Sequence, residues 1–114
     1  MNIQAALCAA TVFLSLSGVA QAVGNPQVKA MMDKSDCFSC HAVDHKLIGP
    51  AYQEVAKRYH GKKASAATIA MLAEKIIKGG NGNWNAETGG IPMTPHPQLS
   101  KQQAEAMVKW VLAQ

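Results

Sequence analysis

The pentapeptide Cys37-Phe38-Ser39-Cys40-His41 is the stretch whose residue types and spacing most clearly predict chemistry. Two cysteines separated by two residues can form a redox dithiol, supply half of a zinc site or, with a following histidine, attach haem. A thioredoxin-like dithiol follows a strand, and a structural zinc site needs four ligands. No strand pattern precedes this motif and no second cysteine pair follows it, so haem attachment is favoured over both alternatives. The prediction is one haem c, bound through thioethers of Cys37 and Cys40, with His41 as an iron ligand.

The ring of a ligand histidine has a second nitrogen, whose N–H needs an acceptor that fixes the ring. The dipeptide Gly49-Pro50 follows the motif after a short loop. Glycine permits close approach of the backbone, and we expect the Pro50 carbonyl to accept the His41 hydrogen bond. The alternative interpretation of Gly49-Pro50 is an ordinary turn before a helix.

A second axial ligand must come from elsewhere in the chain. Met93 is favoured because it lies in "IPMTPHP", where prolines reduce the entropy lost when a loop closes. His96, three residues later, is the competitor and would give a bis-histidine site. The full set of candidates is Met31, Met32, Met71, Met93, Met107, His45, His60 and His96.

The elements that must position these residues are helical. Apolar residues recur at helical spacing in four segments, and none of the sequence after residue 22 alternates with the period of a strand. The expected helices start at Pro26, run over 52–59 and 69–77, and start at Ser100, where Gln103 completes a capping-box pattern. The sequence therefore predicts an all-α fold, four short helices wrapped around one covalently bound haem.

Residues 79–99 are rich in glycine and proline and fit no helix. A loop of this length in a small domain is expected to be functional or to cover something. A flat apolar cofactor would explain it. The side chains expected to bury the haem are Leu47, Ile48, Ile69, Leu72, Ile76, Ile91 and Trp110.

The first 22 residues contain no charge and end in Ala20-Gln21-Ala22, which is typical of a signal-peptidase site. We interpret 1–22 as a cleaved signal peptide and 23–114 as one small domain of the periplasm, with no permanent membrane anchor. Removing 22 of the 114 residues leaves 92, with a net charge of +4. Arg58 is the single arginine and no basic run occurs, which argues against nucleic acid and favours an acidic protein partner.

The motifs together resemble those of the small bacterial class I cytochromes c, especially the subgroup that donates electrons to periplasmic nitrite reductase in denitrifying bacteria. The resemblance runs through the whole of 23–114. It is carried by Cys37-x-x-Cys40-His41, the segment 49–52, Trp84, the segment 91–95 and the terminal "MVKWVLAQ". It differs locally in "GNWNAETGG" and in a histidine at position 96.

This resemblance implies His41 and Met93 as axial ligands, a Pro50 carbonyl bonded to His41, and Trp84 donating to a haem propionate. It implies a monomeric electron carrier of the respiratory chain, with no enzymatic activity. The expected partners are a membrane cytochrome complex as donor and a periplasmic reductase or oxidase as acceptor. The alternatives are a haem subunit docked to a dehydrogenase or reductase, and a haem enzyme or gas binder with a labile sixth ligand.

Overall fold

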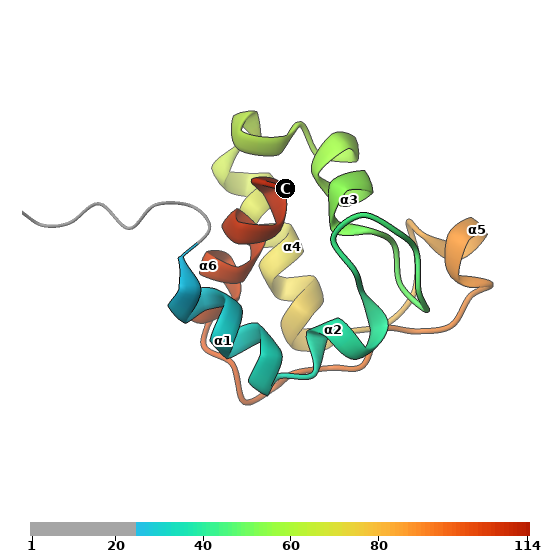
Figure 1. Cartoon of the computed structure of the whole chain (residues 1–114), viewed down its shortest axis with the longest axis horizontal. Helices are drawn as coiled ribbons and strands as arrows, with labels where there is room; N and C mark the ends of the chain where they lie inside the picture. Colours follow the sequence, from blue (N-terminus) through green and yellow to red (C-terminus); the bar gives the residue numbers. More distant parts are fainter. Residues whose placement is uncertain (1–24) are drawn as a thin grey trace, which may run out of the picture.

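The computed structural model describes residues 25–114, so the predicted signal peptide, 1–22, lies outside the described residues. Its helices surround a central C-terminal helix (Figure 1). The elements in order are α1 (Pro26–Lys34), α2 (Cys37–Cys40), α3 (Tyr52–Arg58), the 3₁₀ turn η1 (Gly61–Lys63), α4 (Ala66–Lys78), α5 (Asn85–Thr88) and α6 (Lys101–Leu112). Within 25–114 the only β-type pairing is an isolated antiparallel bridge between Gly80 and Met93. The predicted all-α class is confirmed.

Side chains that satisfy free backbone N–H groups start three of the helices. The Asn25 side chain accepts a hydrogen bond from the Gln27 N–H at 2.8 Å, and Pro26 occupies the first turn of α1. At α6 the Ser100 hydroxyl accepts from Gln103 N at 3.1 Å, while the Gln103 side chain accepts from Ser100 N at 2.9 Å. The capping box predicted there is confirmed. Ser65 caps α4 in the same way through Thr68 N.

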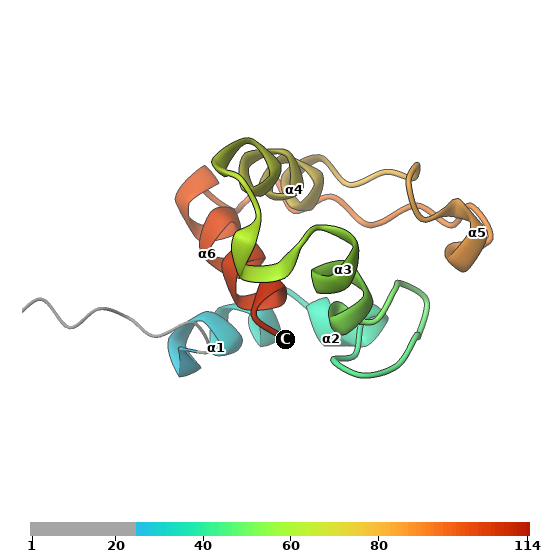
Figure 2. The same ribbon diagram turned by 90° about the horizontal axis from the view of Figure 1, so that it is seen from above.

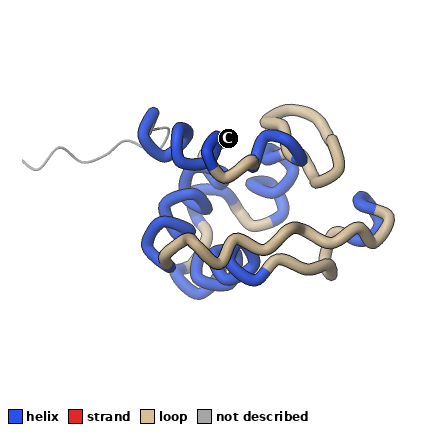
Figure 3. The backbone as a smooth tube through the Cα atoms, turned by 90° about the horizontal axis from the view of Figure 1, so that it is seen from below, coloured by secondary structure: helices blue, strands red, loops and turns tan. Residues whose placement is uncertain are grey.

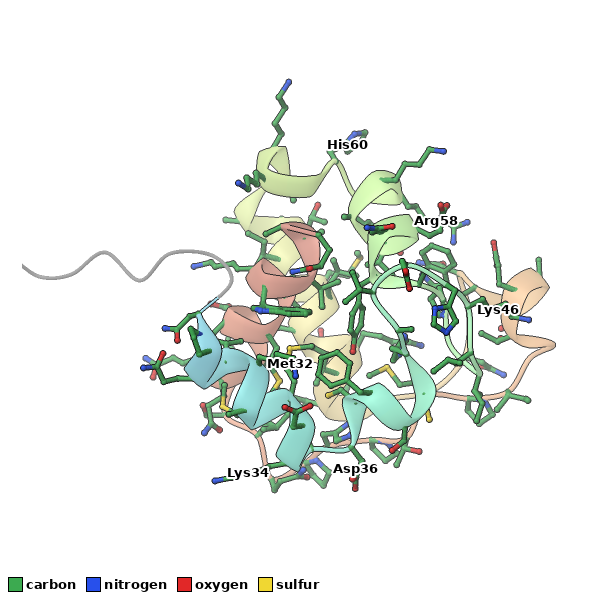
Figure 4. All side chains as sticks on the ribbon, viewed as in Figure 1. Met32, Lys34, Asp36, Lys46, Arg58 and His60 are labelled. Atoms are coloured by element: carbon green, nitrogen blue, oxygen red, sulfur yellow. The ribbon has the colours of Figure 1, made fainter. Side chains whose placement is uncertain are left out.

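Helix α6 is the centre of the packing, since α1, α3, η1 and α4 all contact it. One buried cluster joins α6 to α1 and α3, and a second joins it to α4. Met32, labelled near the centre of the molecule in Figure 4, and Met107 are each 1% exposed. Burial of a side chain of this size stabilises a fold by roughly 1.5–3 kcal/mol. The clusters comprise Met32, Tyr52, Leu99, Met107, Trp110 and Val111, and Ala73, Ala104, Val108 and Leu112.

The segment between α4 and α6 is more ordered than its sequence predicts. Figures 2 and 3 show it leaving the end of α4, turning back at α5 and returning beside itself to α6. The return is fixed by two backbone hydrogen bonds, from Gly80 N to Met93 O at 2.8 Å and from Met93 N to Gly80 O at 2.9 Å. Helix α5 packs against no other described helix. At four residues it is too short for a periodic signal.

No helix within residues 25–114 combines the length and hydropathy that crossing a membrane requires.

Candidate functional site

A cavity of about 740 Å³ opens between α2, the loop 41–51, α4 and the loop 79–96. Its volume falls in the roughly 300–1,000 Å³ range of cofactor and small-molecule sites. All six residues that the sequence predicted as a site line it: Cys37, Cys40, His41, Pro50, Trp84 and Met93. Residues separated by up to 56 positions in the chain are thereby brought to one cavity.

The two cysteines occupy the ends of α2, a single helical turn. Asp36 precedes them in the left-handed backbone region (φ 59°), and His41 follows in an extended conformation, so the chain turns sharply on both sides. Both thiols are free and half-buried. Burial, reinforced by the nearby Asp36 carboxylate, raises the pKa of the Cys37 thiol. One turn of helix therefore presents two thiols to the same cavity, as attachment to one edge of a porphyrin requires.

The His41 imidazole is held by its neighbours on the loop 41–51. Its Nδ1–H donates to the Pro50 carbonyl at 2.8 Å, as the sequence predicts, which leaves the lone pair on Nε2. Burial lowers the pKa of His41, partly offset by this hydrogen bond, so the ring is neutral and suited to bind a metal. The Tyr52 ring stacks on it, with centroids 5.0 Å apart and planes 17° apart.

Gly49 lies against the same imidazole. A Cβ built on Gly49 would come within 3.0 Å of three ring atoms, at 2.8 Å from Nδ1, 2.9 Å from Nε2 and closest to Cε1. Its own N–H donates to the Cys40 carbonyl at 2.7 Å, which ties the loop back to α2. A side chain at this position would occupy the space of the ring. Only glycine fits at position 49 without a shift of the His41 ring or of the loop.

Met93 also lines the cavity, on the loop that returns past α4 (Figure 2). Besides the bridge to Gly80, its carbonyl lies directly over Gly79, whose positive φ of 65° and missing side chain permit the contact. The backbone of Met93 is thus fixed to the end of α4.

The other ligand candidates are placed differently. Met32 and Met107 line the cavity but belong to the buried core, and Met71 lines it with 45% of its surface exposed. The His96 ring faces two backbone carbonyls, Ser35 O at 3.0 Å and Ile76 O at 3.3 Å. The remaining candidates, Met31, His45 and His60, do not line the cavity.

Trp84 lies immediately before α5 and lines the cavity. The Arg58 guanidinium stacks on its ring, 4.1 Å from the ring centroid. Neither this pair nor the Tyr52–His41 stack was expected from the sequence. The partners in the first pair are 26 positions apart, and no local pattern links them.

The apolar lining differs in part from the expected set. Ile48, Leu72, Ile76 and Ile91 line the cavity, but three of the expected residues do not: Leu47, Ile69 and Trp110. Trp110 packs instead in the core against Tyr52, with ring centroids 5.9 Å apart. Ile69 joins the cluster between α4 and α6, and Leu47 is 41% exposed.

These residues fit a haem and do not fit the competing interpretations of the motif. Two thiols, an imidazole with a free Nε2 and a thioether meet at one cavity, and glycines make room for both the imidazole and the thioether-bearing loop. In the part of the chain that the structure describes, no three His, Cys, Asp or Glu side chains converge as a zinc site requires. A haem bound here would be attached at Cys37 and Cys40.

Comparison with known proteins also indicates a haem-binding protein. The cytochrome c family model matches residues 27–114. Cytochrome c-551 of Azotobacter vinelandii is 46% identical over 76 residues, covering 67% of this chain and 83% of that protein. Cytochrome c-551 of Pseudomonas aeruginosa is 36% identical over 96 residues, covering 84% and 85%. The crystal structure of Nitrosomonas europaea cytochrome c552 superposes with a TM-score of 0.61 at 36% identity, covering 74% of this chain and 95% of that one.

Because the match spans almost the whole described domain and includes the attachment motif, the residues and the relatives lead to one assignment. The chain belongs to the cytochrome c family as a class I member, a monohaem electron carrier whose haem c is bound covalently through Cys37 and Cys40.

Proposed function

We propose that the protein carries single electrons in the periplasm, from a membrane cytochrome complex to a periplasmic reductase or oxidase, with His41 and Met93 as axial iron ligands. The observation that supports the proposal is that the imidazole of His41 and the thioether of Met93 line a single cavity. When bound, haem c supplies one iron that exchanges a single electron. His41 and Met93 would hold the iron between them and would leave no position for a substrate.

Each side chain has a defined task in this proposal. His41 offers Nε2 while its Nδ1–H stays on Pro50, which keeps the ring from rotating. Met93 offers a soft thioether sulfur, and Met/His ligation raises the reduction potential. The neighbouring prolines and the backbone bridge to Gly80 hold the Met93 backbone in place, which would limit the reorganisation of the site between oxidation states. Trp84 is proposed to donate its indole N–H to a haem propionate.

The rim of the cavity supports transient docking. Three large apolar side chains line the cavity and are 45–56% exposed: Ile48, Met71 and Ile91. Lys46, labelled in Figure 4 on the loop beside this rim, is exposed. An apolar contact zone with lysines around it suits an acidic redox partner that binds briefly, because charge steers the encounter. We propose that the protein acts as a monomer, and that the acceptor is a nitrite reductase or a terminal oxidase.

Two measurements test the proposal. The reduced holoprotein should transfer electrons to one of these acceptors in stopped-flow mixing, at a rate that falls as ionic strength rises. It should also leave its spectrum unchanged under carbon monoxide at neutral pH. Ready binding of carbon monoxide would favour a haem enzyme or gas binder, whereas electron transfer only within a stable complex would favour a permanently docked subunit.

A further inference from the structure

Residues 81–90, named here the arm, extend from the cavity edge and are held to the body by few contacts. The end of α3 supplies most of them. Arg58 Nη1 donates to the Asn83 carbonyl at 2.7 Å, and the same guanidinium stacks on the Trp84 ring at 4.1 Å. Asn83 Nδ2 donates to the Tyr59 hydroxyl at 3.3 Å. Figure 4 shows Arg58 at the end of α3, on the side of the molecule where the arm protrudes.

A further hydrogen bond between the arm and the body runs from Lys75 Nζ to the Asn81 carbonyl at 2.9 Å, near the point where the arm begins. Several other hydrogen bonds are internal to the arm, such as Asn81 Nδ2 to Gly90 O at 3.3 Å. Since α5 packs against no other described helix, side chains of α3 and α4 hold the arm. Of these, only Arg58 touches both the arm backbone and a side chain that lines the cavity.

We propose that Arg58 is a positioning residue that fastens the arm and sets the place of Trp84 in the cavity wall. A guanidinium can stack on an aromatic face and donate in its own plane at the same time, whereas an ammonium cannot do both. Trp84 lines the cavity and Arg58 does not, so the guanidinium covers the indole from the outer side. Loss of Arg58 frees both the backbone at Asn83 and the indole ring.

The consequence for electron transfer is electrostatic as well as structural. The guanidinium places a permanent positive charge beside the cavity wall, and a positive charge favours the reduced, less positive form of a nearby iron centre. An arm that opens more often also admits water, which stabilises the oxidised form. Both effects of removing Arg58 lower the reduction potential.

The test compares Arg58→Gln and Arg58→Lys with Lys57→Gln in the full holoprotein. Lys57 is the adjacent exposed residue of α3, and its replacement removes the same charge without touching the arm. Hydrogen exchange of the arm amides reports opening directly, since Asn85, Glu87 and Thr88 donate hydrogen bonds of 2.9–3.1 Å within it. Exchange should rise about 5- to 30-fold in both Arg58 variants, the factor that corresponds to about 1–2 kcal/mol, and stay at the wild-type value in Lys57→Gln.

The reduction potential separates positioning from charge. The reduction potential should fall by more in Arg58→Gln than in Lys57→Gln. It should fall by less in Arg58→Lys than in Arg58→Gln, because lysine keeps the positive charge but does not stack on Trp84 as the guanidinium does. Arm exchange in Arg58→Gln that equals the Lys57→Gln value overturns the proposal, as does wild-type exchange in Arg58→Lys. Equal potentials in Arg58→Gln and Lys57→Gln also overturn it. The exchange measurement does not depend on the redox partners, so its failure is distinguishable from failure of the proposed function.

Discussion

Replacement of Gly49 by alanine would place a methyl group against the His41 imidazole. The added carbon would lie 2.8 Å from Nδ1 and 2.9 Å from Nε2, whereas ordinary van der Waals contact begins at 3.4 Å. The ring or the loop must therefore move by at least the difference at Nδ1, about 0.6 Å. The ring resists because Nδ1 bonds to Pro50, and the loop resists because Gly49 N bonds to Cys40 O.

Forcing a methyl group into a packed site costs roughly 1–3 kcal/mol. In a domain of this size each kcal/mol lowers the melting temperature by about 4–8 °C. We expect the melting temperature of the Gly49→Ala holoprotein to be lower by about 4–8 °C for each kcal/mol lost, in a thermal scan followed by circular dichroism. In the oxidised protein, the paramagnetic NMR signals of the His41 ring should move as well, because the ring tilts.

Gly89→Ala is the matched control. Gly89 has a positive φ of 63°, so alanine is strained there, but a Cβ would meet no atom within 4 Å. This variant should lose stability and leave the His41 signals unchanged. A Gly49→Ala protein with the melting temperature and His41 signals of the wild type would refute the reasoning that Gly49 is required by the ring.

The remaining predictions concern ligation, attachment and docking. Met93→Ala should abolish the far-red charge-transfer band of thioether-ligated haem and lower the potential, whereas Met71→Leu should keep the band. A band that persists in Met93→Ala would assign the ligand to another methionine. Haem should stay on the polypeptide through acid–organic extraction, and a Cys37→Ala/Cys40→Ala protein without haem should show little helix by circular dichroism; a cooperative helical apoprotein would contradict haem as part of the core. Lys46→Glu should slow electron exchange with an acidic partner at low ionic strength, and rates indifferent to it would indicate purely apolar docking.

The sequence predicted those parts of the site that depend on local spacing. Cys37, Cys40 and His41 are adjacent, and the hydrogen bond from His41 to Pro50 crosses a loop short enough to reason about. The four longer helices have enough turns to show a period. Met93 was singled out by its flanking prolines, and it lines the cavity as expected.

The features that the sequence could not predict are short or depend on tertiary contacts. Helices α2 and α5 have four residues each, which is barely one turn. The prediction of the residues that line the cavity was partly wrong. An apolar stripe on a helix indicates which residues are buried, but it does not indicate whether a cofactor or another helix covers them. Trp110 and Ile69 lie on such stripes and contact other helices. The Arg58–Trp84 stack joins segments whose approach follows only from the whole fold.

The central place of α6 sets the order in which the protein can mature. Because α1, α3 and α4 pack mainly on this last helix, neither buried cluster can close before residues 101–112 have left the ribosome. Until then the packed helices do not enclose the two thiols of α2, which leaves both open to haem attachment. A chain of this design would receive its cofactor while it is still open, and it would gain its compact form last, when the C-terminal helix docks.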